Sequence, residues 1–268
     1  MLGEAKQRAR EQWAEDPCGA VYGREREFGT REFFDAVERH RYTEYAPWMS
    51  LVMGFNQFAG ARLLEVGCGM GTDLLQFARG GAHVTGVDLV PRSLEITRRR
   101  FQLYGERGHF LVADAERLPF ADESFDVVYS NGVLHHTPGT SRAVGEAHRV
   151  LRRGGTAKVM LYHRDSLAYW GGLMLGRGVL KGEFLRGRSV AELLSRRAEY
   201  SEHDGQPLVK VFSRRQARAL FELFKEAKIE VEQLTRPELR FLSPLVPDNL
   251  FRRLRRALGW NVIITARK

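Results

Sequence analysis

The sequence predicts an α/β protein built on a doubly wound, mostly parallel sheet of seven strands. Three observations support this fold: short apolar runs rich in β-branched residues, amphipathic stretches of helical length between them, and a turn with three glycines after the first run. Strands that alternate with helices imply a parallel sheet covered on both faces. In such sheets ligands bind beyond the carboxyl ends of the strands, so the search for a site begins there.

Seven apolar runs, each bounded by turn-forming or charged residues, are predicted to be the strands. They span residues 62–66, 83–88, 109–114, 125–130, 156–163, 228–234 and 261–267.

Helices are predicted between these runs from apolar periodicity and capping residues. One carries apolar residues at 143, 144, 147, 150 and 151, and Gly154 with Gly155 is expected to stop it. Another begins at Ser213, because Gln216 stands three residues on and completes a capping box. A third capped helix is expected at "SVAELL", residues 189–194.

Length and composition favour a single domain with appendages, because 268 residues with 43% hydrophobic content can bury a sizeable core. The two cysteines are too few for a disulfide framework or a structural zinc site, and no metal site is predicted. The first residues lack the apolar core of a signal peptide, which favours a cytoplasmic protein. Arginine clusters carry most of the +9 net charge; they attract phosphates or acidic lipid, but more often form solvated helix faces.

Three segments, residues 1–50, 164–212 and 236–259, do not follow the alternation of strands and helices. Residues 1–50 are polar and helical in character with scattered aromatics, and we expect them to form an N-terminal cover on a main domain spanning 51–268. Residues 164–212 form an insertion with the apolar, glycine-broken stretch "SLAYWGGLMLGRGVL". The insertion is expected to roof the acceptor site, and its glycines would serve either as hinges of a lid or as tight turns.

The glycine turn "EVGCGMG" is built to approach a ligand closely. Gly67, Gly69 and Gly71 permit positive φ at the strand-to-helix turn, and Asp88 ends the next strand, where a carboxylate accepts ribose hydroxyls. These two facts alone leave a nicotinamide cofactor open. The dinucleotide fingerprint would place its third glycine at position 72, which is Thr72.

Further motifs follow in order, and together they resemble class I S-adenosylmethionine-dependent methyltransferases of the small-molecule type, similar to methyltransferase domain type 11. The resemblance spans about residues 60–165 and rests on "LLEVGCGMGTDL", "VTGVDL", "ADAERLPFADESFDVVYSNGVLHHT" and "EAHRVLRRGGTAKVM". It implies that S-adenosylmethionine is the cofactor and that the sheet has the Rossmann-like methyltransferase topology.

The resemblance also implies roles for residues around the cofactor. The glycine turn would pass under its methionine part, Asp88 would bind the ribose, and Asp114 with the backbone N–H of Ala115 would read the adenine. Glu65 would support the turn and the positive end of the cofactor. The full expected set is Glu65, Gly67, Cys68, Gly69, Gly71, Asp88, Leu89, Asp114, Ala115, Ser130 and Asn131.

Methyl transfer is an in-line displacement in which the acceptor sometimes needs deprotonation, so histidines near the strand ends are the candidate bases. His135 and His136 follow the fourth strand, and either one takes a proton or holds the loop by hydrogen bonds. His163 occupies a comparable place after the fifth strand, together with Tyr162 and Asp165. The remaining candidates are His203 and Asp204 in the insertion, whereas His40 and His109 are expected at the surface or in packing.

The sequence is compatible with three functions. The first is methylation of an oxygen, nitrogen or carbon atom of a small molecule that is acidic or partly apolar, for example one of secondary metabolism. The second is a lipid or quinone methyltransferase at a membrane, with Trp170 and nearby Arg177, Lys181, Arg186 and Arg188 on an anionic surface; membrane contact is open but not favoured. The third is a cofactor-binding protein without turnover or an RNA methyltransferase. No RNA-binding module is recognisable, so no nucleic acid partner is expected. No feature predicts the oligomeric state.

Overall fold

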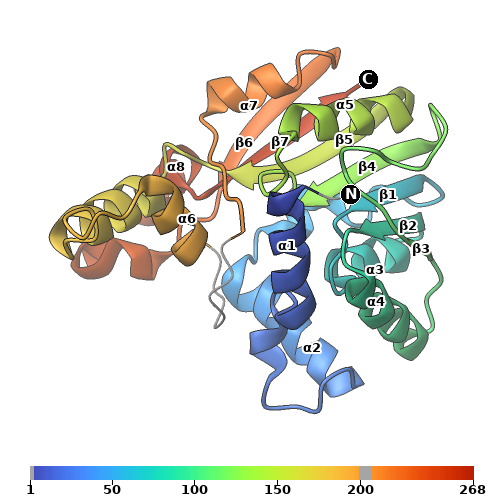
Figure 1. The fold of residues 1–268 in the computed structure, drawn as a ribbon, viewed down its shortest axis with the longest axis horizontal. Coiled ribbons are helices and arrows are strands. Elements are labelled where there is room, and N and C mark those ends of the chain that lie inside the picture. The colour runs from blue at the N-terminus through green and yellow to red at the C-terminus, as the bar shows by residue number, and fades with distance from the viewer. Residues whose placement is uncertain (1–2, 199–206) are drawn as a thin grey trace.

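The computed structural model describes residues 3–198 and 207–268, and they form the predicted α/β fold (Figure 1). One seven-stranded sheet has the order β3-β2-β1-β4-β5-β7-β6. The strands span Arg62–Val66 (β1), His83–Asp88 (β2), His109–Val112 (β3), Phe125–Asn131 (β4), Leu151–Tyr162 (β5), Glu226–Glu232 (β6) and Asn261–Arg267 (β7).

The sheet is mostly parallel, as predicted, with one reversed strand. β1 pairs in parallel with β2 on one side and with β4 on the other. β2 in turn pairs in parallel with β3, and β4 pairs in parallel with β5. β7 runs antiparallel to both β5 and β6. The reversal brings Asn261, at the start of β7, beside Tyr162 at the end of β5. The amino end of β7 therefore lies at the same edge as the carboxyl ends of the parallel strands.

Alternation along each strand creates two hydrophobic cores, one on each face of the sheet. Leu63 contributes to the first core and its neighbour Leu64 to the second, because successive side chains of a strand point to opposite faces. The first face is covered by α3 (Thr72–Arg79), α4 (Pro91–Tyr104) and part of the N-terminal segment. The second is covered by α5 (Thr140–Val150) and α7 (Arg214–Leu220).

The predicted helix starts are confirmed, but one predicted stop is wrong. Ser213 caps α7 through a capping box with Gln216, and Ser189 caps α6 (Val190–Ala198). Helix α5 ends at Val150, and Gly154 and Gly155 lie inside β5 instead of stopping the helix. The pairing of β4 with β5 shifts register between Phe125 and Val127, an irregularity that the positive φ of Gly154 accommodates.

Three strands have limits that differ from the prediction by two residues or more. β3 ends at Val112 and not at 114, because Asp114 turns back to form an isolated bridge with Arg117. β5 begins at Leu151, five residues earlier than expected. β6 spans 226–232 and ends before Gln233, whose positive φ of 68° is incompatible with a continuing strand.

The N-terminal segment is helical and lies against the strand ends (Figure 1, blue). Its elements are α1 (Glu4–Glu15), η1 (Ala20–Gly23), α2 (Arg31–Arg39), η2 (His40–Tyr45) and η3 (Ser50–Gly54). Thr30 caps α2 by accepting a hydrogen bond from the Phe33 N–H. The buried rings of Phe33 and Phe34, in α2, pack against Met70 and Ile96. This contact attaches the N-terminal segment to the rest of the fold.

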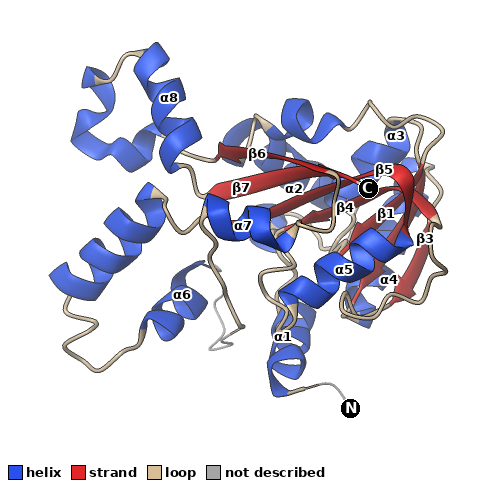
Figure 2. Cartoon of the chain, turned by 90° about the horizontal axis from the view of Figure 1, so that it is seen from above, coloured by secondary structure: helices blue, strands red, loops and turns tan. Residues whose placement is uncertain are grey.

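A second group of helices projects from the opposite end of the sheet to β3 (Figures 1 and 2). It contains η4 (Ala168–Leu180), α6, η5 (Arg236–Leu245) and α8 (Asp248–Leu258). Within the described residues, no helix has both the length and the apolar content needed to cross a membrane.

Candidate functional site

A cavity of about 380 Å³ lies at the edge of the sheet where the parallel strands end. Its floor comes from the ends of β1, β2, β4 and β5 and the start of β7, and its roof from the N-terminal segment. Both its size and its position are typical of small-molecule sites in doubly wound folds, where pockets of roughly 300–1,000 Å³ lie at the strand ends. The floor residues include Val66, Gly67, Gly69, Asp88, Leu89, Asp114, Ala115, Asn131, Met160, Tyr162 and Asn261.

The glycine turn places backbone, without side chains, against this cavity. Gly67, Gly69 and Gly71 all have positive φ, at 77°, 52° and 69°. A Cβ on Gly67 would lie 2.3 Å from Val133 Cγ2, and one on Gly71 would lie 2.8 Å from Thr97 Cγ2. A Cβ on Gly69 would meet no atom of the described part of the chain within 4 Å, and Gly69 lines the cavity. Gly67 and Gly71 thus serve packing, whereas Gly69 leaves space for a ligand.

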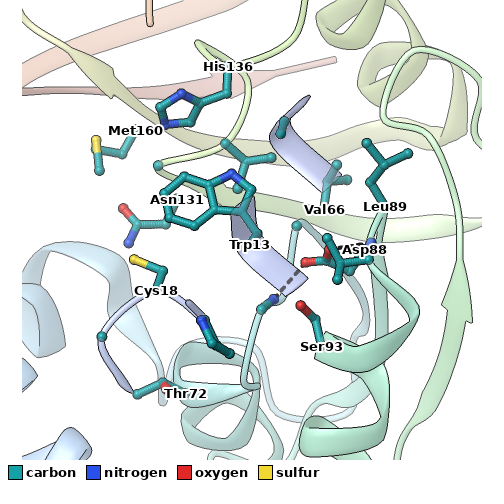
Figure 3. A pocket seen from close by; sticks show the side chains of 18 of the residues that line it. Trp13, Cys18, Val66, Thr72, Asp88, Leu89, Ser93, Asn131, His136 and Met160 are labelled. Atoms are coloured by element: carbon teal, nitrogen blue, oxygen red, sulfur yellow. Dashed lines mark hydrogen bonds between the residues drawn. The ribbon is translucent and has the colours of Figure 1, made fainter. Parts of the chain in front are cut away.

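Asp88 joins the second strand to the glycine turn. One carboxylate oxygen accepts a hydrogen bond of 2.9 Å from the Gly69 N–H, drawn in Figure 3, and the other accepts one of 2.9 Å from the Val90 N–H. Burial raises the pKa of this carboxyl above its ordinary value, while the backbone donors oppose the rise. Each carboxylate oxygen has a second lone pair, so Asp88 can still accept hydroxyl donors from the cavity.

Asp114 is held by the N-terminal helix. The Lys6 ammonium on α1 lies 2.6 Å from Asp114 Oδ2 and 3.1 Å from Glu116 Oε1. The other oxygen, Asp114 Oδ1, accepts a 2.9 Å hydrogen bond from the Glu116 N–H, which shapes the turn after β3. A partly buried ion pair therefore ties the roof of the cavity to its floor.

A buried acidic cluster lies behind the turn. Asp73, in the first turn of α3, accepts two hydrogen bonds of 2.7 Å from Arg41 and others from Tyr42, Tyr129 and Asn131. Burial would raise the pKa of Asp73, but the charge and hydrogen bonds of Arg41 hold it below its ordinary value.

Glu65 is a second carboxyl in this cluster, and it does not line the cavity. It is buried at β1, and its Oε2 has no hydrogen-bond partner among the described residues. Burial, followed by the nearby charge of Asp73, raises the pKa of Glu65 well above its ordinary value. A carboxyl with a raised pKa is favoured in its protonated form unless a positive charge comes close.

Among the three candidate catalytic histidines, the structure brings only His136 to the cavity. It lines the cavity, and its Nδ1 lies 2.7 Å from the carbonyl oxygen of Leu208, which can only accept, so Nδ1 donates this hydrogen bond. His135 is fully buried and packs on Tyr162 with ring centroids 3.9 Å apart and ring planes inclined by 35°, and its pKa is lowered well below its ordinary value, chiefly by burial. His163 is also buried, and its Nδ1 lies 3.0 Å from the Gly259 carbonyl oxygen, outside the lining.

The other expected cofactor residues divide between lining and support. Leu89, Ala115 and Asn131 line the cavity together with Gly67, Gly69, Asp88 and Asp114. Cys68 is buried with a raised pKa, and its sulfur packs beside Gly86. The Ser130 hydroxyl donates to the Val66 carbonyl at 2.9 Å. Cys68 and Ser130 thus stabilise the floor from behind it, as does Gly71.

The roof was only partly foreseen from the sequence. The described residues of the insertion, 164–198 and 207–212, do not line the cavity, and η4 lies with α6 and α8, apart from α1 (Figure 1). His203 and Asp204 lie outside the described residues. Lys210, in the insertion, contacts the loop that carries His135 and His136. Its ammonium donates hydrogen bonds to the Thr137 and Pro138 carbonyls and so stabilises this loop.

Helix α1 and the segment after it supply the groups that sequence reasoning missed. In Figure 3 the Trp13 indole lies between Asp88 and Asn131, and its ring centroid is 5.9 Å from that of His136. His40, which was expected at the surface or in packing, lines the cavity and stacks on Tyr22 at 3.5 Å. The only signal for these residues was the density of aromatics in 1–50, which does not show where each ring points.

Comparisons with known proteins match the sheet region. Residues 64–159 match the family model described as a methyltransferase domain. The chain is 37% identical over 94 residues to sterol 4-C-methyltransferase strm-1 of Caenorhabditis elegans, covering 34% of this chain and 28% of that protein. It is 43% identical over 99 residues to the phthiotriol/phenolphthiotriol dimycocerosates methyltransferase of Mycobacterium leprae, covering 36% of each. The match thus spans about a third of these relatives.

Solved structures resemble the fold over nearly the whole chain. A putative methyltransferase of Haloferax volcanii, solved with the Trm112 methyltransferase activator, has a TM-score of 0.56 at 17% identity and covers 100% of this chain and 98% of its own. The (4+2)-cyclase SpnF has a TM-score of 0.55 at 20% identity and covers 98% of this chain and 93% of its own. At these identities the likeness shows the fold alone, and a neighbour described as a cyclase illustrates that one fold serves several reactions.

Proposed function

We propose that this chain, whose residues 64–159 form a methyltransferase domain, transfers a methyl group from S-adenosylmethionine to a small-molecule acceptor. The observation that carries the proposal is one cavity at the carboxyl edge of the sheet, which brings together the bare backbone of Gly69, the carboxylate of Asp88 and the imidazole of His136. Matched relatives named as a sterol 4-C-methyltransferase and as a phthiotriol/phenolphthiotriol dimycocerosates methyltransferase support this class of reaction.

The residues at this edge fit S-adenosylmethionine. The open space beside Gly69 would be filled by a Cβ, so the turn leaves room for a group pressed against its backbone. Asp88 retains lone pairs for the ribose hydroxyls, and Leu89 and Ala115 offer apolar surface for the adenine, with Asp114 at its edge. Glu65, buried beside Asp73, supplies a carboxyl whose ionised form a cationic ligand would favour.

S-adenosylmethionine supplies an electrophilic methyl group on a sulfonium. The protein binds and orients the reactants, because most of the rate gain in such displacements comes from positioning. Asp88 and Asp114 would hold one side of the cavity, and the roof around Trp13 would exclude water. The acceptor would occupy the part of the cavity near Asn131, Met160 and Asn261, at the ends of the central strands.

We assign the proton-accepting role to His136 for acceptors that carry an acidic hydroxyl or amine. The 2.7 Å contact of Nδ1 with the Leu208 carbonyl oxygen orients the ring at the cavity lining, where an imidazole can accept a proton from the acceptor. His135 and His163 are assigned to support of the loop and the strand ends, since both are buried outside the lining. His136→Gln is expected to lower turnover roughly 10²–10⁴-fold with little change in cofactor affinity. Equal loss of cofactor binding would contradict this role.

Calorimetric titration with S-adenosylmethionine and, separately, with NADH tests the proposal. We expect binding of S-adenosylmethionine alone, weakened in Asp88→Ala by about 1–3 kcal/mol through lost charge-assisted hydrogen bonds. Asp122→Ala is the matched control, because Asp122 pairs with Arg149 at the surface. Binding of NADH, or an unchanged affinity in Asp88→Ala, would refute the cofactor assignment. A positive result is followed by a screen of acceptors for a one-methyl mass increase.

A further inference from the structure

The helix after β5 exposes large apolar side chains on one of its faces. In η4 the buried residues Tyr169, Leu173 and Gly178 recur every four to five positions, as expected for i→i+5 hydrogen bonding. The exposed apolar residues recur at the same interval on another face and continue into the following turn. We call them the η4 apolar patch, with their exposed fractions: Trp170 57%, Leu175 54%, Val179 58%, Leu180 75% and Leu185 92%.

The patch is held in place by packing beneath it. The Phe184 ring lies so close to Gly178 that a Cβ there would approach it to 2.1 Å, and the Phe184 N–H donates to the Gly178 carbonyl at 3.1 Å. Arg188 pairs with the buried Glu183 in the same turn. The turn after η4 is therefore folded back on the helix, and the leucines are exposed by the fold itself.

The charges around the patch are positive. Residues 168–190 contain Arg177, Lys181, Arg186 and Arg188 against a single acidic residue, the buried Glu183. Helix α8, at the same end of the molecule (Figures 1 and 2), adds exposed arginines at 252, 253 and 256. A single exposed leucine is ordinary, but a row of large apolar residues bordered by cations is the pattern of a surface that enters a lipid interface.

We propose that η4 and the turn after it form a docking surface for an anionic lipid bilayer. Trp170 and the leucines would enter the interfacial region, where indole rings are favoured, and the surrounding cations would contact acidic headgroups. Nucleic acid would match the charge but would leave the leucines exposed, so charge and apolarity together favour lipid. The proposal does not depend on the reaction at the cavity, since the described residues of η4 do not line it.

Vesicle flotation tests this docking surface. Wild-type protein is expected to float with vesicles of phosphatidylcholine and phosphatidylglycerol in equal amounts, less with phosphatidylcholine alone, and less as salt rises. The double variant Leu175→Glu with Leu180→Glu should reduce binding at least about tenfold. Its matched control is Leu51→Glu with Leu223→Glu, two leucines exposed elsewhere (84% and 63%), which should bind as wild type.

Tryptophan fluorescence locates the contact. Mixed vesicles should shift the emission to shorter wavelengths in the wild type, and Trp170→Phe should lose most of that shift while still floating. Unchanged S-adenosylmethionine affinity or circular dichroism in each variant shows that it is folded. The proposal is overturned if wild-type protein does not float with mixed vesicles, if both double variants lose binding equally, or if the protein binds RNA but no vesicle.

Discussion

At the residue scale, the glycines of one turn have separable tasks. Gly67→Ala would place a Cβ 2.3 Å from Val133 at a φ of 77°, whereas Gly69→Ala adds a Cβ in open space at a φ of 52°. We expect Gly67→Ala to lower the free energy of unfolding by about 2–4 kcal/mol, from left-handed strain and overpacking. Gly69→Ala should cost only about 1 kcal/mol yet weaken S-adenosylmethionine binding. Urea denaturation and calorimetry measure both; equal stability losses would contradict the distinction.

His135 makes stability depend on pH. Its pKa is lowered well below its ordinary value in the folded protein, chiefly by burial and to a smaller extent by the neighbouring His136 ring. Below about pH 6.5, His135 is protonated in the unfolded chain but stays neutral in the folded protein. The free energy of unfolding therefore falls as pH falls, by at most about 1.4 kcal/mol per pH unit for this one group. His135→Phe, which keeps an aromatic ring against Tyr162, should flatten the profile below pH 6.5. An unchanged slope in denaturation between pH 5 and 7 would contradict this origin.

At the scale of elements, helix α1 is attached to the floor of the cavity by few contacts. Only Ala9 and Gln12 of α1 are buried, while Lys6 pairs with Asp114 and Glu116 across the cavity. Such a helix derives little stability from burial, so ion pairs and the Trp13 ring contribute much of its attachment.

Removing the Lys6 ammonium should therefore loosen α1. Lys6→Met is expected to speed protease cleavage within residues 4–15 severalfold, because opening of the helix requires less free energy. Arg8→Met is the control, since Arg8 pairs with Glu4 on the same exposed helix face. Equal cleavage rates of Lys6→Met and wild type would show that the ion pairs do not hold α1.

At the scale of the whole molecule, ligand binding at the sheet edge should stabilise the entire fold. The cavity joins all the central strands and the N-terminal segment, so a ligand bound only to the folded state shifts the global unfolding equilibrium. S-adenosylmethionine at a hundredfold its Kd should add about 2.7 kcal/mol and raise Tm by roughly 5–10 °C, as measured by calorimetry. NADH at the same concentration should leave Tm unchanged; a shift with NADH alone would identify a different ligand.

Much of the fold was predictable because its signals are local. The alternation that separates Leu63 from Leu64, the capping box at Ser213 and the full extent of β7 follow from period and chemistry within a few residues. The prediction that Gly154 ends a helix was wrong because the glycine lies in β5, where it accommodates an irregularity in the pairing with β4. The sequence around Gly154 does not show this, since β4 is distant in the chain.

The sequence by itself determined the glycine turn, the carboxylate at Asp88 and the succession of strand and helix segments along the chain, since each depends on residues close together in the chain. Only the tertiary structure decided which histidine reaches the cavity, since adjacent residues His135 and His136 point into different surroundings. It also decided that α1 forms the roof while the apolar η4 stays exposed. Contacts such as Lys6 with Asp114 join positions more than a hundred residues apart, and the packing of the complete chain selects them.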